Sequence, residues 1–240
     1  MHHYQGKDIE AVLCPGFPSA AKGIAEFTGR LKTTCESHSR IMVVEVMGRD
    51  AGWLTGSAIF GGASIALIPE FEITKERKES FFETVKEEYL RSEKKSLIIA
   101  VSEGTRWYDD AKGRVDVVYA SSELDEYGHP RFGGISGVIA SDISKRTGIE
   151  ARAQISGYYP RSGDCRKYDR RLTTTLADKL TDLLLREEYG RMPVMNKIVP
   201  YQELEEFNCS TIDMGDIGNM PLPEVYYLSL IHISEPTRPY

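Results

Sequence analysis

Three arginines and one glutamate lie beside short apolar runs of the 240-residue chain: Arg49, Arg152, Arg161 and Glu103. A guanidinium group can bind two phosphate oxygens at once, and neighbouring glycines let the backbone approach an anion closely. A carboxylate such as Glu103 accepts hydrogen bonds from sugar hydroxyl groups. These residue types predict a site for a sugar phosphate more than for a nucleotide base. Each arginine, taken alone, is also compatible with a surface ion pair.

Apolar runs rich in β-branched residues predict the strands that position these side chains. The runs cover residues 41–47, 64–68, 96–101 and 151–156. Helical periodicity occurs around them, over residues 19–31, 53–60, 74–91, 134–145 and 169–188. Strands that alternate with helices predict an α/β fold, in which helices flank both faces of a parallel sheet.

Ligands of such folds bind beyond the carboxyl ends of the strands, so the residues after each strand are the candidates for chemistry. Four segments qualify: residues 47–53 (MGRDAGW), 68–70 (IPE), 102–105 (SEGT) and 157–163 (GYYPRSG). We therefore expect Arg49, Arg152 and Arg161 to converge at strand ends.

A glycine-rich segment, residues 133–137 (GGISG), opens one of the predicted helices. Its backbone amides could face an anion, as helix N-termini do. The spacing does not match a dinucleotide fingerprint, so close helix packing is the favoured explanation.

The composition of the chain argues against two classes of binding partner, nucleic acids and membranes. The chain is 41% hydrophobic and 28% charged with a net charge of −6, which argues against a nucleic-acid surface. No apolar run approaches the ~20 residues that cross a bilayer, and no signal peptide opens the chain, so no membrane partner is expected. The four cysteines are scattered without C-x-x-C spacing, which predicts neither a zinc site nor disulfides and fits a cytoplasmic protein.

Residues 37–53 (SHSRIMVVEVMGRDAGW) resemble the segment with which phosphofructokinases hold fructose 6-phosphate. The Met-Gly-Arg turn and the spacing from Arg40 to Met47 both match. Further motifs follow in the family's order: Pro69-Glu70, Glu103-Gly104, residues 128–134 (GHPRFGG) and residues 151–170. The resemblance covers residues 14–227 and implies a phosphofructokinase-like fold that is incomplete here.

The resemblance also implies roles for individual residues around the sugar. Met47, Gly48 and Arg49 resemble the loop that embraces it. Glu103 resembles the carboxylate that contacts its hydroxyl groups.

Four more positions resemble residues that bind the substrate in this family. Tyr158 and Arg161 resemble the pair at the 6-phosphate. Arg40 and Arg152 are similar to arginines that reach into the neighbouring subunit's sugar site in bacterial members. A homo-oligomer, either a dimer or a tetramer, is therefore implied.

As a member of this family, the parent protein would be a 6-phosphofructokinase, a kinase of glycolysis that uses Mg²⁺ and either pyrophosphate or ATP. Tyr158 stands where bacterial ATP-dependent enzymes have histidine and where pyrophosphate-dependent relatives often have tyrosine. Residues 50–53 and 14–17 favour the same donor. Pyrophosphate is therefore slightly favoured over ATP.

The family's catalytic aspartate, in a T-I-D-N-D motif, is expected shortly before Cys14. The sequence there is GKDIEAVL, and the neighbours of Asp8 do not match the motif. The family's Gly-Gly-Asp loop, which binds the donor and magnesium, lies further upstream. The catalytic residue and the metal ligands are thus expected in a missing N-terminal part, no metal ligand is assigned to this chain, and the fragment is expected to be inactive.

The two ends of the chain fall outside this pattern. Residues 1–13 form an uncertain junction, and residues 228–240 (LSLIHISEPTRPY) resemble the translation of a sequencing adapter. A non-catalytic, sugar-phosphate-binding regulatory subunit of the same fold remains an alternative function. A nucleotide-binding dehydrogenase would need a G-x-G-x-x-G motif, which the sequence lacks.

Overall fold

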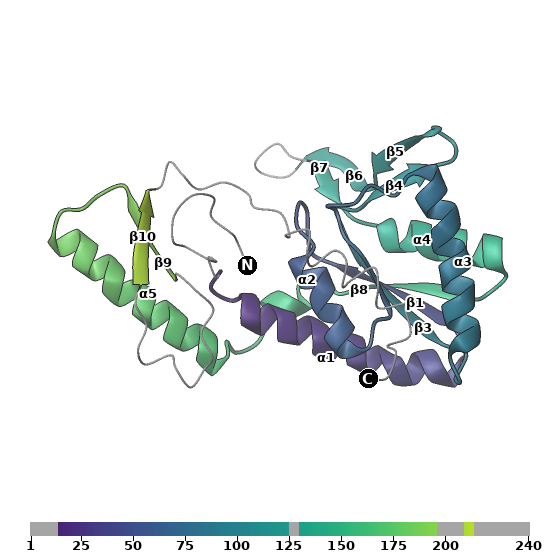
Figure 1. Ribbon diagram of the computed structural model, residues 1–240, viewed down its shortest axis with the longest axis horizontal. Helices are drawn as coiled ribbons and strands as arrows, with labels where there is room; N and C mark the ends of the chain where they lie inside the picture. The colour runs from purple at the N-terminus through teal and green to yellow at the C-terminus, as the bar shows by residue number, and fades with distance from the viewer. Residues whose placement is uncertain (1–13, 125–129, 196–208, 214–240) are drawn as a thin grey trace, which may run out of the picture.

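The computed structural model describes residues 14–124, 130–195 and 209–213, and its centre is a four-stranded parallel sheet (Figure 1). The strand order is β2-β3-β1-β8. The strands are β1 (Ile41–Val46), β2 (Ile65–Leu67), β3 (Leu97–Ser102) and β8 (Ala151–Ile155). The helices around them are α1 (Phe17–Ser37), α2 (Trp53–Gly56), the 3₁₀ helix η1 (Ser57–Gly61), α3 (Lys75–Arg91) and α4 (Ile135–Thr147). The four strands predicted from the sequence are confirmed to within one residue at each end.

Two hydrophobic cores lie on the two faces of the sheet. Every residue of β1 is buried, and its side chains alternate between the cores. Val43 packs in one core with Val85 of α3 and Ile139 of α4. Val44 packs in the other core with Ile24 of α1. The prediction that helices cover both faces of a parallel sheet is therefore confirmed.

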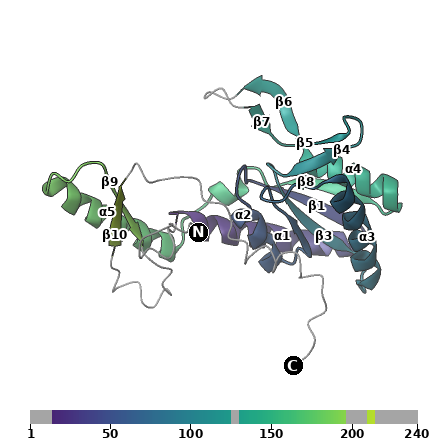
Figure 2. The same cartoon turned by 45° about the horizontal axis from the view of Figure 1, so that its top comes forward.

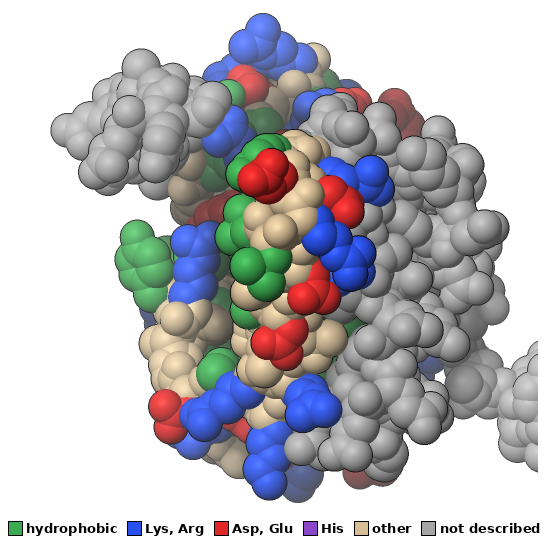
Figure 3. All heavy atoms as spheres, turned by 90° about the vertical axis from the view of Figure 1, so that its left-hand side faces the viewer, with side chains coloured by type: hydrophobic (Ala, Val, Ile, Leu, Met, Phe, Trp, Pro, Cys, Tyr) green, Lys and Arg blue, Asp and Glu red, His purple; other side chains and the backbone are tan. Residues whose placement is uncertain are grey.

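A smaller unit follows the sheet along the chain. It contains α5 (Lys167–Leu185) and an antiparallel pair, β9 (Arg191–Met195) and β10 (Cys209–Asp213). The predicted helix over residues 169–188 ends earlier than expected, because Glu187 already has a positive φ of 57°. Leu172 on α5 is fully buried, whereas Leu184 is 55% exposed. Hydrophobic and charged side chains lie next to each other at this end of the molecule (Figure 3).

Three hairpins were not predicted. Between β3 and α4 lie β4 (Arg106–Asp109), β5 (Arg114–Val117), β6 (Tyr119–Leu124) and β7 (Pro130–Phe132), which pair as β4-β5 and β6-β7. The third is β9-β10, near the C-terminal end of the described residues. These strands are short, and two contain proline, so their periodicity is weak. Figure 2 shows β6 and β7 standing away from the parallel sheet.

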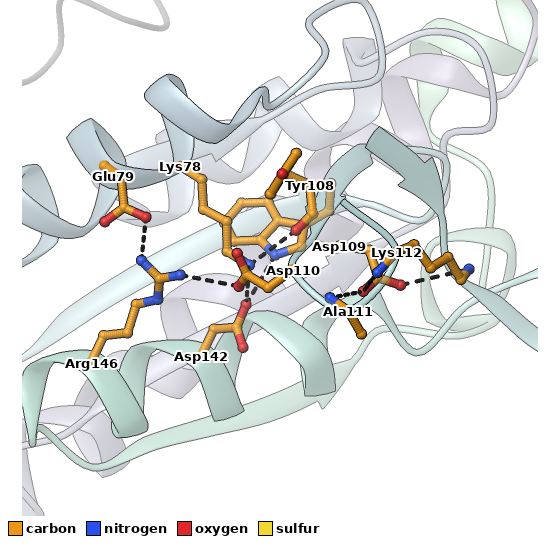
Figure 4. Close-up of polar contacts among 10 residues, drawn as sticks. Lys78, Glu79, Tyr108, Asp109, Asp110, Ala111, Lys112, Asp142 and Arg146 are labelled. Atoms are coloured by element: carbon orange, nitrogen blue, oxygen red, sulfur yellow. Dashed lines mark hydrogen bonds and ion pairs between the residues drawn. The ribbon is translucent and has the colours of Figure 1, made fainter. Parts of the chain in front are cut away.

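A buried lysine attaches the β4-β5 hairpin to the helices. Lys78 on α3 is 2% exposed, and its ammonium group donates to the backbone oxygen of Tyr108 at 3.0 Å. The same group pairs with Asp110 at 2.9 Å and with Asp142 of α4 at 2.8 Å (Figure 4). Arg146 of α4 also contacts Asp110, at 3.0 Å. All three donors of the buried ammonium group are therefore used, as a buried charge requires.

Asp169 on α5 caps the N-terminus of α1, and its removal should destabilise the protein. Its carboxylate accepts from the amides of Gly16 at 2.8 Å and Ser19 at 2.9 Å, and from the Ser19 hydroxyl. Asp169→Ala should lower the free energy of unfolding by about 0.5–2 kcal/mol, because it removes a helix cap and leaves the amides of Gly16 and Ser19 without this acceptor. Urea denaturation followed by circular dichroism measures this. Asp178→Ala, at an exposed position of the same helix, is the control; equal effects of the two changes would contradict the capping role.

Candidate functional site

The loops after β1 and β3 are tied together at the carboxyl edge of the sheet. The amide of Glu103 donates to the carbonyl of Val46 at 3.0 Å, and the amide of Gly104 donates to the carbonyl of Gly48 at 3.0 Å. In return, the amide of Gly48 donates to the Glu103 carboxylate at 3.3 Å. Two of the four segments selected from the sequence, residues 47–53 and 102–105, are therefore in direct contact.

This contact is too close for side chains at the two glycines. A Cβ atom on Gly104 would lie 1.9 Å from the backbone oxygen of Arg49, and one on Gly48 would lie 3.0 Å from the Ser102 hydroxyl. The Ser102 hydroxyl also shares a 2.6 Å hydrogen bond with Thr55 of α2, and both groups are buried. The loop that carries Arg49 thus packs directly against the end of β3, which is hydrogen-bonded to α2.

Arg161 reaches the same edge from the end of β8. It is the last residue of the 3₁₀ helix η2 (Tyr159–Arg161), and its amide donates to the carbonyl of Tyr158 at 2.9 Å. Pro160 is buried, and the Tyr159 ring lies 5.4 Å from the ring of Phe27 on α1. These contacts anchor η2, while the side chains of Tyr158 and Arg161 stay exposed.

The pKa of Glu103 depends on its burial and on the charges around it. Burial raises the pKa of Glu103 above its ordinary value, and the nearby Glu45 carboxylate adds to the increase. The hydrogen bond from Gly48 opposes it, as do the positive charges of Arg161 and Arg49. The geometry agrees, because β3, β1 and β8 are neighbours in the parallel sheet and Glu103, Arg49 and Arg161 follow their carboxyl ends.

The raised pKa makes a testable contribution to stability. The folded chain holds the Glu103 proton more tightly than the unfolded chain, so the free energy of unfolding should fall as the pH rises from 4.5, the ordinary value, through the raised one. Glu103→Gln removes this decrease. The variant should therefore gain stability relative to wild type with increasing pH across that window.

Urea titrations between about pH 4 and pH 8 measure this difference. Glu87→Gln, at an exposed position on α3, is the matched control. A Glu103→Gln curve that runs parallel to the wild-type curve would contradict the raised pKa of Glu103.

Arg40 and Arg152 lie elsewhere. Arg40 directly precedes β1, and Arg152 pairs in register with Met42 near the start of β8, so both are at the amino end of the sheet. The six residues of β1 separate the two ends by about 20 Å. Within one chain, Arg152 therefore does not converge with Arg49, because it opens its strand instead of following it.

Glu150 neutralises this second pair of arginines. Its carboxylate lies 2.8 Å from Nε of Arg152 and 3.9 Å from Nη2 of Arg40. The hydrogen bond from Arg152, followed by the charge of Arg40, holds the pKa of Glu150 below its ordinary range. The sequence analysis did not identify this carboxylate, although it stands two residues before Arg152.

The glycine-rich start of α4 already binds an anion, which is the carboxylate of Glu45. The amides of Gly134 and Ser136 both donate to it at 3.0 Å, and the Ser136 hydroxyl donates at 2.7 Å. A Cβ atom on Gly134 would meet its nearest neighbour only at 4.0 Å, and one on Gly137 would meet nothing within 4 Å, so these two glycines do not mark the close helix packing that we favoured. The segment binds a carboxylate of the protein itself. Glu45 itself was missed, although a charge inside the apolar run IMVVEVM was a signal that it needs a buried partner.

Several expectations fall outside the described part of the chain. These expectations concern Asp8, the junction at residues 1–13 and the adapter-like residues 228–240. Within the described residues, no three His, Cys, Asp or Glu side chains are grouped to hold a metal ion, so these residues do not fit the Mg²⁺ that the family resemblance implies. No helix in the described ranges is long and apolar enough to cross a membrane.

Fold and site together define an α/β protein whose sheet presents two guanidinium groups and a partly buried carboxylate at its carboxyl edge. The family model described as phosphofructokinase matches residues 8–184. The chain belongs to the phosphofructokinase family, which confirms the resemblance.

Similar proteins include enzymes named for either phosphoryl donor. The ATP-dependent 6-phosphofructokinase 2 of Streptomyces coelicolor is 36% identical over 75% of this chain and 50% of its own length. The pyrophosphate–fructose 6-phosphate 1-phosphotransferase of the same organism is 38% identical over 74% and 49%. The enzyme of that name from Thermoproteus tenax is 38% identical over 88% and 52%. The chain thus spans about half the length of these relatives.

Solved structures show the same fold. A pyrophosphate-dependent phosphofructokinase from Nitrosospira multiformis superposes with a TM-score of 0.69 and 23% identity, over 92% of this chain and 51% of the other. Phosphofructokinase from Saccharomyces cerevisiae superposes with a TM-score of 0.61 and 25% identity, over 83% and 24%. The predicted phosphofructokinase-like α/β class is confirmed.

Proposed function

We propose that this chain is the fructose 6-phosphate-binding portion of a 6-phosphofructokinase. The complete enzyme, meaning a chain of full family length that contains this sequence, phosphorylates the C1 hydroxyl of fructose 6-phosphate to give fructose 1,6-bisphosphate. It acts in glycolysis, in the cytoplasm, as a homo-oligomer. The observation that carries this proposal is the placement of Arg49, Glu103 and Arg161 after the carboxyl ends of three neighbouring parallel strands, β1, β3 and β8.

The geometry suits the acceptor sugar. The exposed guanidinium groups of Arg49 and Arg161 stand on anchored segments and can bind the 6-phosphate, with Tyr158 close to Arg161 in the chain. Glu103 accepts hydrogen bonds from the sugar hydroxyls, and the Met47–Arg49 loop surrounds the ring. Arg40 and Arg152 lie at the far end of the sheet. We assign them to the sugar site of a neighbouring subunit, as the family resemblance implies.

Phosphoryl transfer also needs a base and a metal-bridged donor. We assign both to other parts of the complete enzyme, together with the Mg²⁺ that accompanies the donor. Pyrophosphate is the favoured donor, on the evidence of Tyr158 and residues 50–53. The 240-residue chain by itself is therefore inactive.

Calorimetry and a coupled assay on the purified 240-residue chain test these statements. The chain should bind fructose 6-phosphate, bind fructose far more weakly, and produce no fructose 1,6-bisphosphate with either donor. The complete enzyme should turn over faster with pyrophosphate than with ATP. Failure to bind fructose 6-phosphate would remove the proposed site, and turnover by the chain alone would contradict its assigned incompleteness.

A non-catalytic regulatory subunit is the second candidate. It would bind fructose 6-phosphate through the same groups, Arg49, Glu103 and Arg161, and would lack the catalytic aspartate and the donor loop even at full length. A complete protein that binds fructose 6-phosphate but transfers no phosphoryl group from either donor would establish this alternative.

A further inference from the structure

The guanidinium group of Arg49 lies over an aromatic ring that comes from outside the parallel sheet. Its central carbon is 4.7 Å from the centroid of the Phe132 ring. Phe132 is the last residue of β7, and it pairs with Tyr119 of β6, whose ring centroid lies 5.7 Å away. The β6-β7 hairpin therefore contacts a residue of the proposed sugar site.

The end of this hairpin is attached to β1, the strand that precedes the Arg49 loop. Gly134, two residues after Phe132, donates its amide to the Glu45 carboxylate at 3.0 Å, and Ser136 donates at 3.0 Å. Glu45 is 5% exposed and stands four residues before Arg49. The segments that carry Arg49 and Phe132 are therefore joined through the buried carboxylate of Glu45. This connection keeps the guanidinium group and the ring close together.

The contact leaves the arginine able to bind an anion. Stacking uses the flat face of a guanidinium group, whereas hydrogen bonds to phosphate or hydroxyl oxygens use the N–H groups at its edge. A ring beneath the guanidinium group restricts a long, exposed side chain before any ligand arrives. Restricting it in advance lowers the entropy lost on binding.

We propose that Phe132 is a positioning residue of the sugar-phosphate site, which holds the Arg49 guanidinium group in its ligand-binding orientation. The proposal rests on the function proposed above. It makes the β6-β7 hairpin, which the strand-end rule did not select, a functional element of the site.

Calorimetric titration of fructose 6-phosphate into the 240-residue chain tests this role. Phe132→Leu keeps an apolar side chain but removes the ring, and it should raise the Kd about two- to fivefold, the size of an exposed cation–π contact. Phe132→Tyr keeps the ring and should restore wild-type affinity. Phe71→Leu is the matched control, because the Phe71 ring lies 5.5 Å from Arg77 in a similar contact away from the site.

A double-mutant cycle separates positioning from general stability. If Phe132 acts through Arg49, Phe132→Leu should have no further effect on Kd once Arg49→Ala is present. A Kd for Phe132→Leu equal to that of wild type, or additive effects of the two changes, would overturn the proposal. If wild type itself does not bind fructose 6-phosphate, the proposed function fails instead, and the two failures are therefore distinguishable.

Discussion

Arg161→Ala should raise the KM of the complete enzyme for fructose 6-phosphate by roughly 10- to 150-fold, with an unchanged KM for the phosphoryl donor. Arg161 is anchored by η2 and reaches the edge where it acts on the charge of Glu103. A charge-assisted hydrogen bond from it to the 6-phosphate contributes about 1.5–3 kcal/mol, which corresponds to that range. Steady-state kinetics with the sugar and the donor varied in turn measure both constants.

Two further variants make this experiment specific. Arg161→Lys keeps the charge but loses the planar fork, so its KM for the sugar should lie between those of wild type and Arg161→Ala. Arg114→Ala removes an exposed arginine on β5 that pairs only loosely, at 3.4 Å, with Asp116, and it should leave both constants unchanged. An unchanged sugar KM in Arg161→Ala would remove this arginine from the site.

The central sheet could be predicted because its strands are buried on both faces. The mostly apolar run of residues 41–46 is a strong signal, since its five apolar side chains alternate between the two cores. The hairpins between β3 and α4 lack that signal. Their strands are short and lie at the surface, as the exposed Arg106 and Arg114 illustrate, so their positions depend on contacts such as those of Lys78.

The candidate site could be predicted as far as the strand-end rule applies. The rule placed Arg49, Glu103 and Arg161 at one edge, and the structure has them there. It failed for Arg152, because a residue near the start of a strand lies at the opposite end of the sheet. A residue at the start of a strand and a residue just after its end are only a few positions apart in the sequence, but they lie about 20 Å apart in space.

Long-range polar contacts could not be predicted at all. Asp169 bonds to residues 150 and 153 positions away, and Glu45 bonds to residues 89 and 91 positions away. A sequence shows that a buried carboxylate needs donors, but it does not show which helix N-terminus supplies them. The contact between Arg49 and Phe132 depends on the second of these pairings, which explains why Phe132 was missed.

Gly104→Ala should weaken the binding of fructose 6-phosphate to the 240-residue chain by roughly 10- to 150-fold, because displacing Arg49 removes a charge-assisted contact worth about 1.5–3 kcal/mol. The new Cβ atom would lie 1.9 Å from the backbone oxygen of Arg49 and 2.7 Å from its carbonyl carbon. Neither atom is the end of a flexible side chain. The loop that carries Arg49 must therefore move away from Glu103, and calorimetry of sugar binding reports the displacement.

Gly137→Ala makes the same chemical change at a position in α4 where a Cβ atom would meet nothing within 4 Å. It should leave sugar binding unchanged and stabilise the chain by about 0.5–1 kcal/mol, since alanine favours a helix over glycine. Circular dichroism of both variants establishes whether Gly104→Ala stays folded. A folded Gly104→Ala chain with wild-type affinity would mean that the Arg49 backbone can move without any effect on ligand binding. That result would exclude the Arg49 loop from the sugar-phosphate site and leave only Arg161 and Glu103 in it.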